Sequence, residues 1–195
     1  MLADVPNFNV VGEAKTGEEA VQLVRTHRPR VVLMDVRMPG IGGLEATKKI
    51  LTIDDTTRVI AVTAISDDLY TDRFMKAGAV GYVTKEAGFD EIIKAITTVV
   101  NGGRYMSSDV AQQLALRSFS GGTDRSPFED LSERELQTAV MISNGMKVND
   151  IADSFCISPK TVNSYRYRIF EKLKINSDVE LALLAVKHHL LEVEK

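Results

Sequence analysis

The chain has 195 residues, of which 44% are hydrophobic and 26% are charged, and its formal net charge is −3. This size and composition are typical of a soluble protein with one or two domains, and the charge argues against a chain that coats nucleic acid along its whole length. No apolar run approaches the roughly eighteen residues of a membrane-spanning helix and no signal peptide opens the sequence, so we expect a cytoplasmic protein without membrane insertion.

Strand and helix patterns alternate over the first two-thirds of the chain, which predicts a doubly wound α/β domain. We expect strands over residues 8–12, 31–35, 59–63 and 80–84. We expect helices over residues 16–26, 43–51, 67–77 and 89–100, and a short further helix over residues 107–116. Residues 118–127 then have the Ser-, Gly- and Pro-rich composition of a linker.

Polar side chains stand at the ends of three of these strands. The apolar run 31–34 looks buried on both faces and ends in Asp35, and the later strands end in Thr63 and just before Lys85. Because ligands of open α/β sheets bind at the carboxyl ends of the strands, we expect these three side chains to share one edge. A phosphoryl group would need this set, with the carboxylate attacking phosphorus and the other two side chains holding its oxygens. Each residue taken singly also has an ordinary structural interpretation: Asp35 as a loop cap, Thr63 as a helix cap and Lys85 as a surface lysine.

This set, at this spacing, resembles the receiver domain of two-component response regulators. The resemblance implies that Asp35 is the phospho-acceptor, Thr63 the switch hydroxyl, Lys85 the accompanying cation and Tyr82 the switch aromatic. A core aromatic is the ordinary alternative for Tyr82. The family also implies Mg²⁺, for which Asp35 and the backbone carbonyl of Arg37 are the matching groups in this chain.

From Leu131 onward the pattern is entirely helical. Ser132 and Glu135 form a capping box at the start of a helix that ends at Asn144-Gly145. A short helix over residues 148–155, a tight turn and a longer helix opened by Ser158-Pro159 make a helix-turn-helix pattern, and a fourth helix covers residues 178–191. The single cysteine, Cys156, precedes this cap among apolar residues and is expected to be a buried, inert thiol.

The longer helix concentrates positive charge. Its core positions are Val162, Tyr165, Ile169 and Leu173, and its cations are Lys160, Arg166, Arg168, Lys172 and Lys174. Over residues 158–174 only Glu171 opposes these cations, so the segment carries +5 − 1 = +4. A solvated charged face is the ordinary interpretation, but the tight turn, the clustered charge and the preceding linker favour a helix that enters a DNA groove.

The segment 131–173 resembles the LuxR-type helix-turn-helix, and a receiver joined to it is the NarL/FixJ class of response regulator. Residues 40–47 and 158–168 look like the GacA/UvrY subgroup, which implies an activator of small regulatory RNA genes that answers a membrane sensor kinase. Many members have His at Tyr165, so the operator sequence stays open. The resemblance implies contacts to bases or phosphates by Lys160, Thr161, Asn163, Ser164, Tyr167, Arg168 and Lys172.

A receiver opens with a strand that ends in an acidic pair of metal ligands, and the sequence shows no such strand. In the order 2-1-3-4-5 that strand is central, so its absence would leave two unpaired edges. We expect a start about twenty residues upstream of Met1, the size of the missing strand, loop and partial helix; the alternative is a receiver that folds poorly or borrows a strand. Asp35 and the Arg37 carbonyl alone would make a weak Mg²⁺ site.

We therefore expect a flavodoxin-like α/β receiver over residues 1–106, a linker with a short helix over 107–130, and an all-α LuxR-type domain over 131–191. Phosphoryl transfer from a sensor histidine kinase to Asp35 would control homodimerisation and binding to palindromic promoter DNA, without enzymatic turnover. One alternative is a phosphorylation-independent DNA-binding module with a degenerate receiver. A phosphohydrolase is disfavoured because Arg37 stands where such enzymes place a general-acid Asp.

Overall fold

The structure, a computed structural model, describes residues 2–63, 68–119, 126–188 and 190–191. Two compact units make up the chain: one built from residues 2–63 and 73–107, and one that contains residues 68–72 and the C-terminal helices from residue 108 onward. None of the helices in the described ranges is both long enough and apolar enough to cross a membrane.

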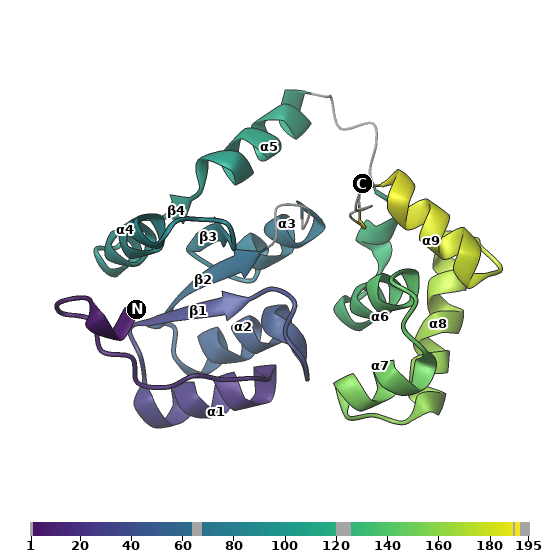
Figure 1. The fold of residues 1–195 in the computed structure, drawn as a ribbon, viewed down its shortest axis with the longest axis horizontal. Coiled ribbons are helices and arrows are strands. Elements are labelled where there is room, and N and C mark those ends of the chain that lie inside the picture. The colour runs from purple at the N-terminus through teal and green to yellow at the C-terminus, as the bar shows by residue number, and fades with distance from the viewer. Residues whose placement is uncertain (1, 64–67, 120–125, 189, 192–195) are drawn as a thin grey trace. The chain divides into compact units, whose positions relative to one another are not determined.

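A parallel sheet forms the centre of the first unit, with its four strands in the order of the sequence (Figure 1). The strands are β1 (Val31–Asp35), β2 (Arg58–Thr63), β3 (Gly81–Thr84) and β4 (Tyr105–Met106). Helix α4 (Phe89–Val100) packs on one face; α2 (Gly42–Ile53) covers the other and holds α1 (Gly17–His27) against itself. Helix α3 (Asp68–Lys76) lies between β2 and β3 in the chain. The predicted doubly wound α/β architecture is confirmed.

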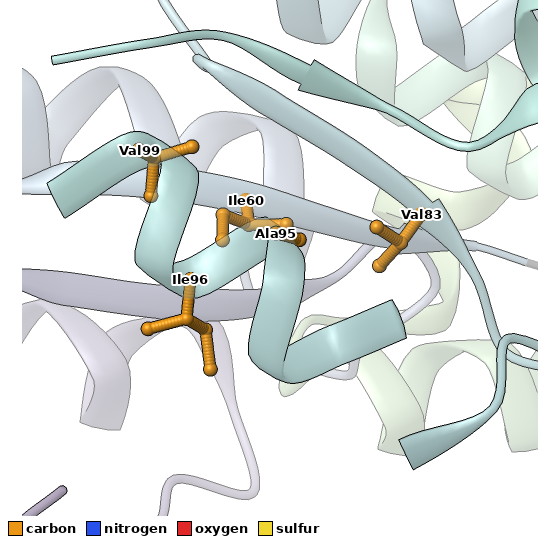
Figure 2. Close-up of a cluster of buried hydrophobic side chains, with 5 residues drawn as sticks. All are labelled: Ile60, Val83, Ala95, Ile96 and Val99. Carbon is orange, nitrogen blue, oxygen red and sulfur yellow. The ribbon is translucent and has the colours of Figure 1, made fainter. Parts of the chain in front are cut away.

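The core beneath α4 follows from the periodicities of helix and strand. Ala95, Ile96 and Val99 lie on one face of the helix and meet Ile60 and Val83 of the sheet, all five being buried (Figure 2). Partly buried side chains pack around this cluster, among them Leu2 of the short 3₁₀ segment η1 (Leu2–Asp4) and Phe8. Burial on this face therefore joins the start of the described chain to the sheet without any backbone pairing.

The predicted strand over residues 8–12 is not observed. This segment has no regular structure, and its Val10 and Val11 are exposed. An extended segment becomes a strand only when a partner lies within about 4.8 Å, and among the described strands β1 pairs with β2 alone. The expectation that β1 is buried on both faces is also wrong, because only Met34 of this edge strand is fully buried.

The other elements agree with the predicted boundaries to within a few residues. The short helix after the first domain is α5 (Ser108–Phe119), and strand β4 was missed because its two residues make no apolar run. Parts of three predictions lie outside the described residues: position 67 of the third predicted helix, positions 120–125 of the linker and position 189 of the last helix.

The helical domain consists of one short 3₁₀ segment and four α-helices. They are η2 (Pro127–Asp130), α6 (Glu133–Ser143), α7 (Val148–Phe155), α8 (Pro159–Leu173) and α9 (Asp178–Lys187). Helix α6 packs against both α8 and α9, and α7 packs against α8. The predicted capping box is confirmed: the Ser132 hydroxyl accepts from the backbone of Glu135, whose carboxylate accepts from the backbone of Ser132.

Two positions near the turns differ from expectation. Phe128 of η2 is fully buried and its ring lies 6.2 Å from that of His188, so the helical domain begins before the predicted boundary at Leu131. Cys156 is exposed rather than buried. It ends α7 in the left-handed conformation with φ of 54°, and the neighbouring Phe155 supplies the buried side chain at this end of the helix.

The burial of Phe128 predicts that Phe128→Ala lowers the free energy of unfolding of the helical domain by about 3–5 kcal/mol, since it leaves a cavity. The exposed Leu116 of α5 is the matched control, and Leu116→Ala should change stability by less than about 0.5 kcal/mol. Urea unfolding followed by the NMR methyl signals of Ile151 and Ile169 measures both. Equal changes in stability for the two variants would mean that η2 belongs to the linker and does not pack on the helical domain.

Candidate phosphoryl-acceptor site and DNA-facing helix

The parallel register brings the three predicted strand ends to one edge of the sheet. Asp35 is paired with Val62 across β1 and β2, and Thr63 with Thr84 across β2 and β3. Lys85 follows directly, and its Nζ donates to Oδ2 of Asp35 at 2.8 Å. The two side chains are 40% and 47% exposed, so both the pair and a ligand placed beside it are open to solvent. An exposed pair of this kind stabilises a fold by about 1 kcal/mol at most.

The second oxygen of Asp35 is held by the backbone that follows β1. Oδ1 accepts from the backbone N–H of Arg37 at 2.9 Å, and Val36 continues the ladder by donating to the carbonyl of Val62. Both carboxylate oxygens therefore have a donor, one from the backbone just after β1 and one from the side chain just after β3. The carboxylate is oriented rather than free to rotate.

The loop beyond Arg37 is fastened by the start of α1. The N–H of Gly17 donates to the carbonyl of Pro39, and Oε2 of Glu18 accepts from the N–H of Ile41 at 3.0 Å. Gly40, with φ of 74°, leaves room for that carboxylate, since a Cβ there would lie 1.9 Å from Glu18 Oε2. Helix α1, which precedes β1 in the chain, thus fixes the loop that follows the candidate acceptor.

Helix α2 approaches the same strand end closely. A Cβ at Gly43 would lie 2.1 Å from the backbone carbonyl oxygen of Asp35. Only glycine allows the first turn of α2 to lie this near to β1.

Thr63 and Tyr82 are both buried. The backbone carbonyl of Thr63 accepts from the N–H of Lys85, so the ends of β2 and β3 are tied together beside Asp35. Tyr82 is 1% exposed, and its ring meets that of Phe74 edge to face at 6.3 Å. The sheet edge therefore holds Asp35, Thr63 and Lys85 together, whereas Tyr82 lies inside the domain, and the switch roles of these residues stay predictions.

The described residues do not fit a divalent cation at this edge. They contain no group of three or more His, Cys, Asp or Glu arranged as metal ligands. Asp35 is the carboxylate of the site, and its two oxygens already accept from Lys85 and Arg37. A Mg²⁺ ion requires near-octahedral oxygen coordination, which Asp35 and the Arg37 carbonyl do not supply by themselves.

In the helical domain, α7 and α8 are joined by the tight turn that the sequence predicts for a helix-turn-helix. Ile157 donates to the carbonyl of Ala152 and the Ser158 hydroxyl accepts from the N–H of Thr161, which closes α7 and caps α8. Three core positions of α8 are buried and the fourth, Tyr165, is half-buried. The buried side chains are Val162, Ile169 and Leu173.

The predicted DNA contacts all lie on α8, outside its buried stripe. Five are exposed and two are half-buried. The exposed ones are Lys160, Ser164, Tyr167, Arg168 and Lys172, and the half-buried ones are Thr161 and Asn163. The hydroxyls of Thr161 and Ser164 already bond within the first turns, to the Ser158 hydroxyl and the Lys160 carbonyl respectively. The contacts of these residues with DNA stay predictions.

Two of the four cations of α8 are paired inside the domain. Lys172 Nζ donates to Oε2 of Glu135 at 2.6 Å and to the carbonyl of Asp130, which ties α8 to α6 and η2. Arg166 forms a two-pronged ion pair with Asp178. Sequence reasoning missed both pairs because each partner lies on another helix. The pairing gives Lys172 a structural role inside the domain, unlike the other residues that were predicted to contact DNA.

Glu135 is the most buried carboxylate of these pairs, with a side chain 4% exposed. Burial raises its pKa, but the ammonium of Lys172 and the hydrogen bonds from Ser132 outweigh burial and hold the pKa below its ordinary value of 4.5. The carboxylate is therefore ionised at neutral pH and joins the capping box of α6 to α8.

The close approach of α2 predicts that Gly43→Ala displaces the end of β1 and destabilises the first unit by about 1–3 kcal/mol through overpacking. Gly88→Ala is the matched control, because a Cβ at Gly88 meets nothing within 4 Å. Thermal unfolding and the NMR amide signal of Asp35 measure the two effects. If both variants shift that signal alike, the contact does not position Asp35.

Removing the cation beside Glu135 should weaken the dependence of stability on pH. Lys172→Met leaves a buried carboxylate unpaired and should lower the free energy of unfolding by about 1–3 kcal/mol at pH 7. In the unaltered chain the contribution of Glu135 is present above pH 4.5 and is lost as the pH falls through its lowered pKa. In Lys172→Met the hydrogen bonds from Ser132 remain but the ammonium no longer opposes burial, so the pKa of Glu135 rises and acidification from neutral pH should remove less stability than in the unaltered chain.

Urea unfolding followed by the Ile169 methyl signal from neutral to acidic pH tests this weaker dependence. Lys174→Met is the control, since Lys174 is exposed and forms no ion pair with another described residue. The same pH trend in both variants would contradict the structural role of the Lys172–Glu135 pair.

Comparison with known proteins agrees with this division of the chain. The sequence matches the model of the response regulator receiver domain over residues 1–97 and that of the bacterial regulatory proteins of the luxR family over residues 129–185. It is 56% identical to the response regulator GacA of Pseudomonas aeruginosa over 192 residues, which covers 98% of this chain and 90% of the relative. It is 49% identical to UvrY of Escherichia coli K12 over 194 residues, covering 100% and 89%.

Solved structures give the same result. A LuxR-family two-component response regulator from Aurantimonas is 37% identical, with a TM-score of 0.57 over 60% of this chain and 83% of that one. RcsB of Salmonella enterica serovar Typhimurium, bound to the rprA promoter in the presence of phosphomimetic BeF₃⁻, shares the fold at 22% identity, with a TM-score of 0.60 over 94% and 88%. The chain belongs to the two-component response regulators of the NarL/FixJ class, transcription factors in which a receiver domain is joined to a LuxR-type helix-turn-helix domain.

Proposed function

We propose that the receiver of this response regulator accepts a phosphoryl group on Asp35, and that the modified receiver controls dimerisation and DNA binding by the helical domain. The observation that carries the proposal is the 2.8 Å contact between Lys85 Nζ and Asp35 Oδ2 at the sheet edge that also holds Thr63. A fixed cation beside an oriented, solvent-accessible carboxylate suits capture of a tetrahedral anion.

In the transfer step, an oxygen of Asp35 attacks the phosphorus of a phosphohistidine on the sensor kinase. A P–O bond forms and the P–N bond breaks, and the nitrogen of the leaving imidazole takes up a proton from water. The product carries more negative charge at the sheet edge than the carboxylate did. Lys85, already within reach of Asp35, can then pair with a phosphoryl oxygen, and the Thr63 hydroxyl can donate to another.

The signal would pass from this edge through buried side chains. Tyr82 lies two residues before Thr84 on β3 and its ring is packed inside, against Phe74. A phosphoryl group that holds Thr63 would favour this inward ring over an outward one, and would thereby change the faces formed by α3 and α4. Such a switch is a shift between two populations, with the local charge supplying the bias.

The exposed face of α8 is the proposed reader of DNA. Asn163, Ser164 and Tyr167 carry groups that hydrogen-bond base edges, while Lys160 and Arg168 are cations suited to phosphates. Neither cation forms an ion pair with another described residue, whereas Arg166 and Lys172 do. The charge available for DNA is therefore smaller than the count of cations on the helix.

A second copy of the chain is the proposed partner along α9. Val179 and Leu183 are 69% and 66% exposed and lie beside Val186 on one face of this helix. Two domains paired through this face would present two copies of α8, which suits a roughly palindromic promoter site with half-sites one helical turn apart.

One observation favours a second function. The described residues contain no group of three or more His, Cys, Asp or Glu that could hold a metal ion, which favours a receiver that is not phosphorylated and serves only as a dimerisation or partner-binding module. DNA binding would then be independent of any phosphoryl donor.

Acetyl phosphate or beryllofluoride, each supplied with Mg²⁺, separates the two functions. We expect either reagent to increase dimer formation, measured by light scattering, and to tighten binding to a duplex selected with the unaltered chain from a random-sequence pool. Asp35→Asn is the matched control and should respond to neither reagent. An unaltered chain that also fails to respond would support the phosphorylation-independent module.

Two substitutions on α8 distinguish a contact to the DNA phosphates from a contact to a base. Lys160→Ala should weaken binding to all duplexes and reduce the slope of log K against log salt by about one, since one phosphate contact is lost. Asn163→Ala should instead reduce discrimination at one base position by about 1–3 kcal/mol. Fluorescence anisotropy on the selected duplex and on single-base variants measures both. If both proteins bind like the unaltered chain, the assignment of α8 to a groove is wrong.

A further inference from the structure

Arg166 lies in the middle of the cationic helix α8, where a contact with DNA phosphate would be expected. Its side chain is instead bonded to another helix of the same domain. Its Nε donates to Oδ1 of Asp178 at 2.7 Å and its Nη2 to Oδ2 at 2.6 Å, so both prongs of the guanidinium meet one carboxylate. The guanidinium also lies over the ring of Phe170, with its central carbon 5.2 Å from the ring centroid. The Arg166 side chain is only 30% exposed.

Asp178 is the first residue of α9, immediately after the cap residue Ser177. A carboxylate at this position is stabilised by the helix N-terminus, and it also receives the guanidinium from α8. The turn between the helices is closed on both sides. Ile175 donates to the carbonyl of Phe170, and Asn176 donates to the carboxylate of Glu180.

The same end of α9 borders an apolar hollow. Its lining includes Asp178, Val179 and Leu183 of α9 and Ile142 of α6. These α9 side chains belong to the face that we assign to the second copy of the chain. Arg166 therefore connects the helix proposed to read DNA with the helix proposed to form the dimer.

We propose that Arg166 is a positioning residue rather than a DNA contact. By its two-pronged bond to Asp178 it sets the angle between α8 and α9, and so the separation and orientation of the two reading helices in a dimer. This inference rests on the proposed function, in that it requires DNA binding by a dimer. It makes the Arg166–Asp178 pair a determinant of half-site spacing, with no contact to a base.

The geometry makes lysine a poor substitute at this position. An ammonium keeps the charge but cannot form two parallel bonds to one carboxylate or stack flat on Phe170. A phosphate contact, in contrast, tolerates lysine because a point charge suffices. Arg166→Lys thus separates the two roles.

The test uses the full chain and a duplex that the unaltered chain selects from a random-sequence pool. Binding is measured by anisotropy over a range of salt for Arg166→Gln, Arg166→Lys, Asp178→Asn and the double variant Arg166→Gln with Asp178→Asn. We expect each single variant to bind about fivefold to thirtyfold more weakly, the double variant to be no worse than the singles, and the salt slope to stay unchanged. Arg168→Gln, on the proposed DNA face, should reduce the slope by about one.

A second readout separates positioning from a loss of stability. Duplexes whose two half-sites are moved apart or together by one base pair should lose less affinity with the Arg166 and Asp178 variants than with the unaltered chain. A variant that was merely unstable would lose the same factor on every duplex, and the Ile169 methyl signal would report its unfolded fraction.

Several outcomes would overturn the inference. If Arg166→Gln lowers the salt slope by about one while Asp178→Asn binds as well as the unaltered chain, Arg166 is a phosphate contact. Full binding by Arg166→Lys leads to the same conclusion, and equal losses on every spacing exclude a positioning role. An unaltered chain that selects no duplex at all would remove the proposed function, and the inference with it.

Discussion

The parallel register of β1, β2 and β3 is the constraint on which the candidate site depends. Pairing of Asp35 with Val62 and of Thr63 with Thr84 places three distant segments at one edge, and the side chain of Lys85 completes the set. No single contact there is strong, since the ion pair is open to solvent. The site is held by the sheet and by the backbone donors and glycines that surround Asp35, so the geometry follows from the fold rather than from the pair itself.

In the helical domain the corresponding constraint is the anchoring of α8. Its buried stripe sets which face turns outward, and two of its four cations fasten it to neighbouring helices. Lys172 joins it to α6 through Glu135, and Arg166 joins it to α9 through Asp178. Charge on a helix thus serves two purposes, and a sum over the sequence cannot divide them, because the division depends on which carboxylates the tertiary fold brings near.

Sequence reasoning predicted the elements whose signals are local. Helices α4 and α7 have the predicted bounds, and the capping box of α6 and the Asp35–Lys85 convergence were also found from spacing. The predictions that failed concern residues whose structure depends on other segments of the chain. Residues 8–12 have the pattern of a strand but no partner strand among the described residues, and β4 is too short to give a pattern. Phe128 is buried in a fold that brings η2 and His188 together, and Cys156 ends a helix on its exposed side. The clamp of Glu18 on the loop after β1 likewise has no local signal.

The central claim is that Asp35, Thr63 and Lys85 converge to hold one phosphoryl group. A fluorine NMR spectrum of the full chain with beryllofluoride tests it most directly, because fluorides bound at Asp35 resonate apart from free beryllofluoride and show Overhauser contacts to nearby protons. We expect bound resonances with contacts to Lys85 and Thr63 that disappear in Asp35→Asn. Only free beryllofluoride, or bound resonances that persist in Asp35→Asn, would contradict it.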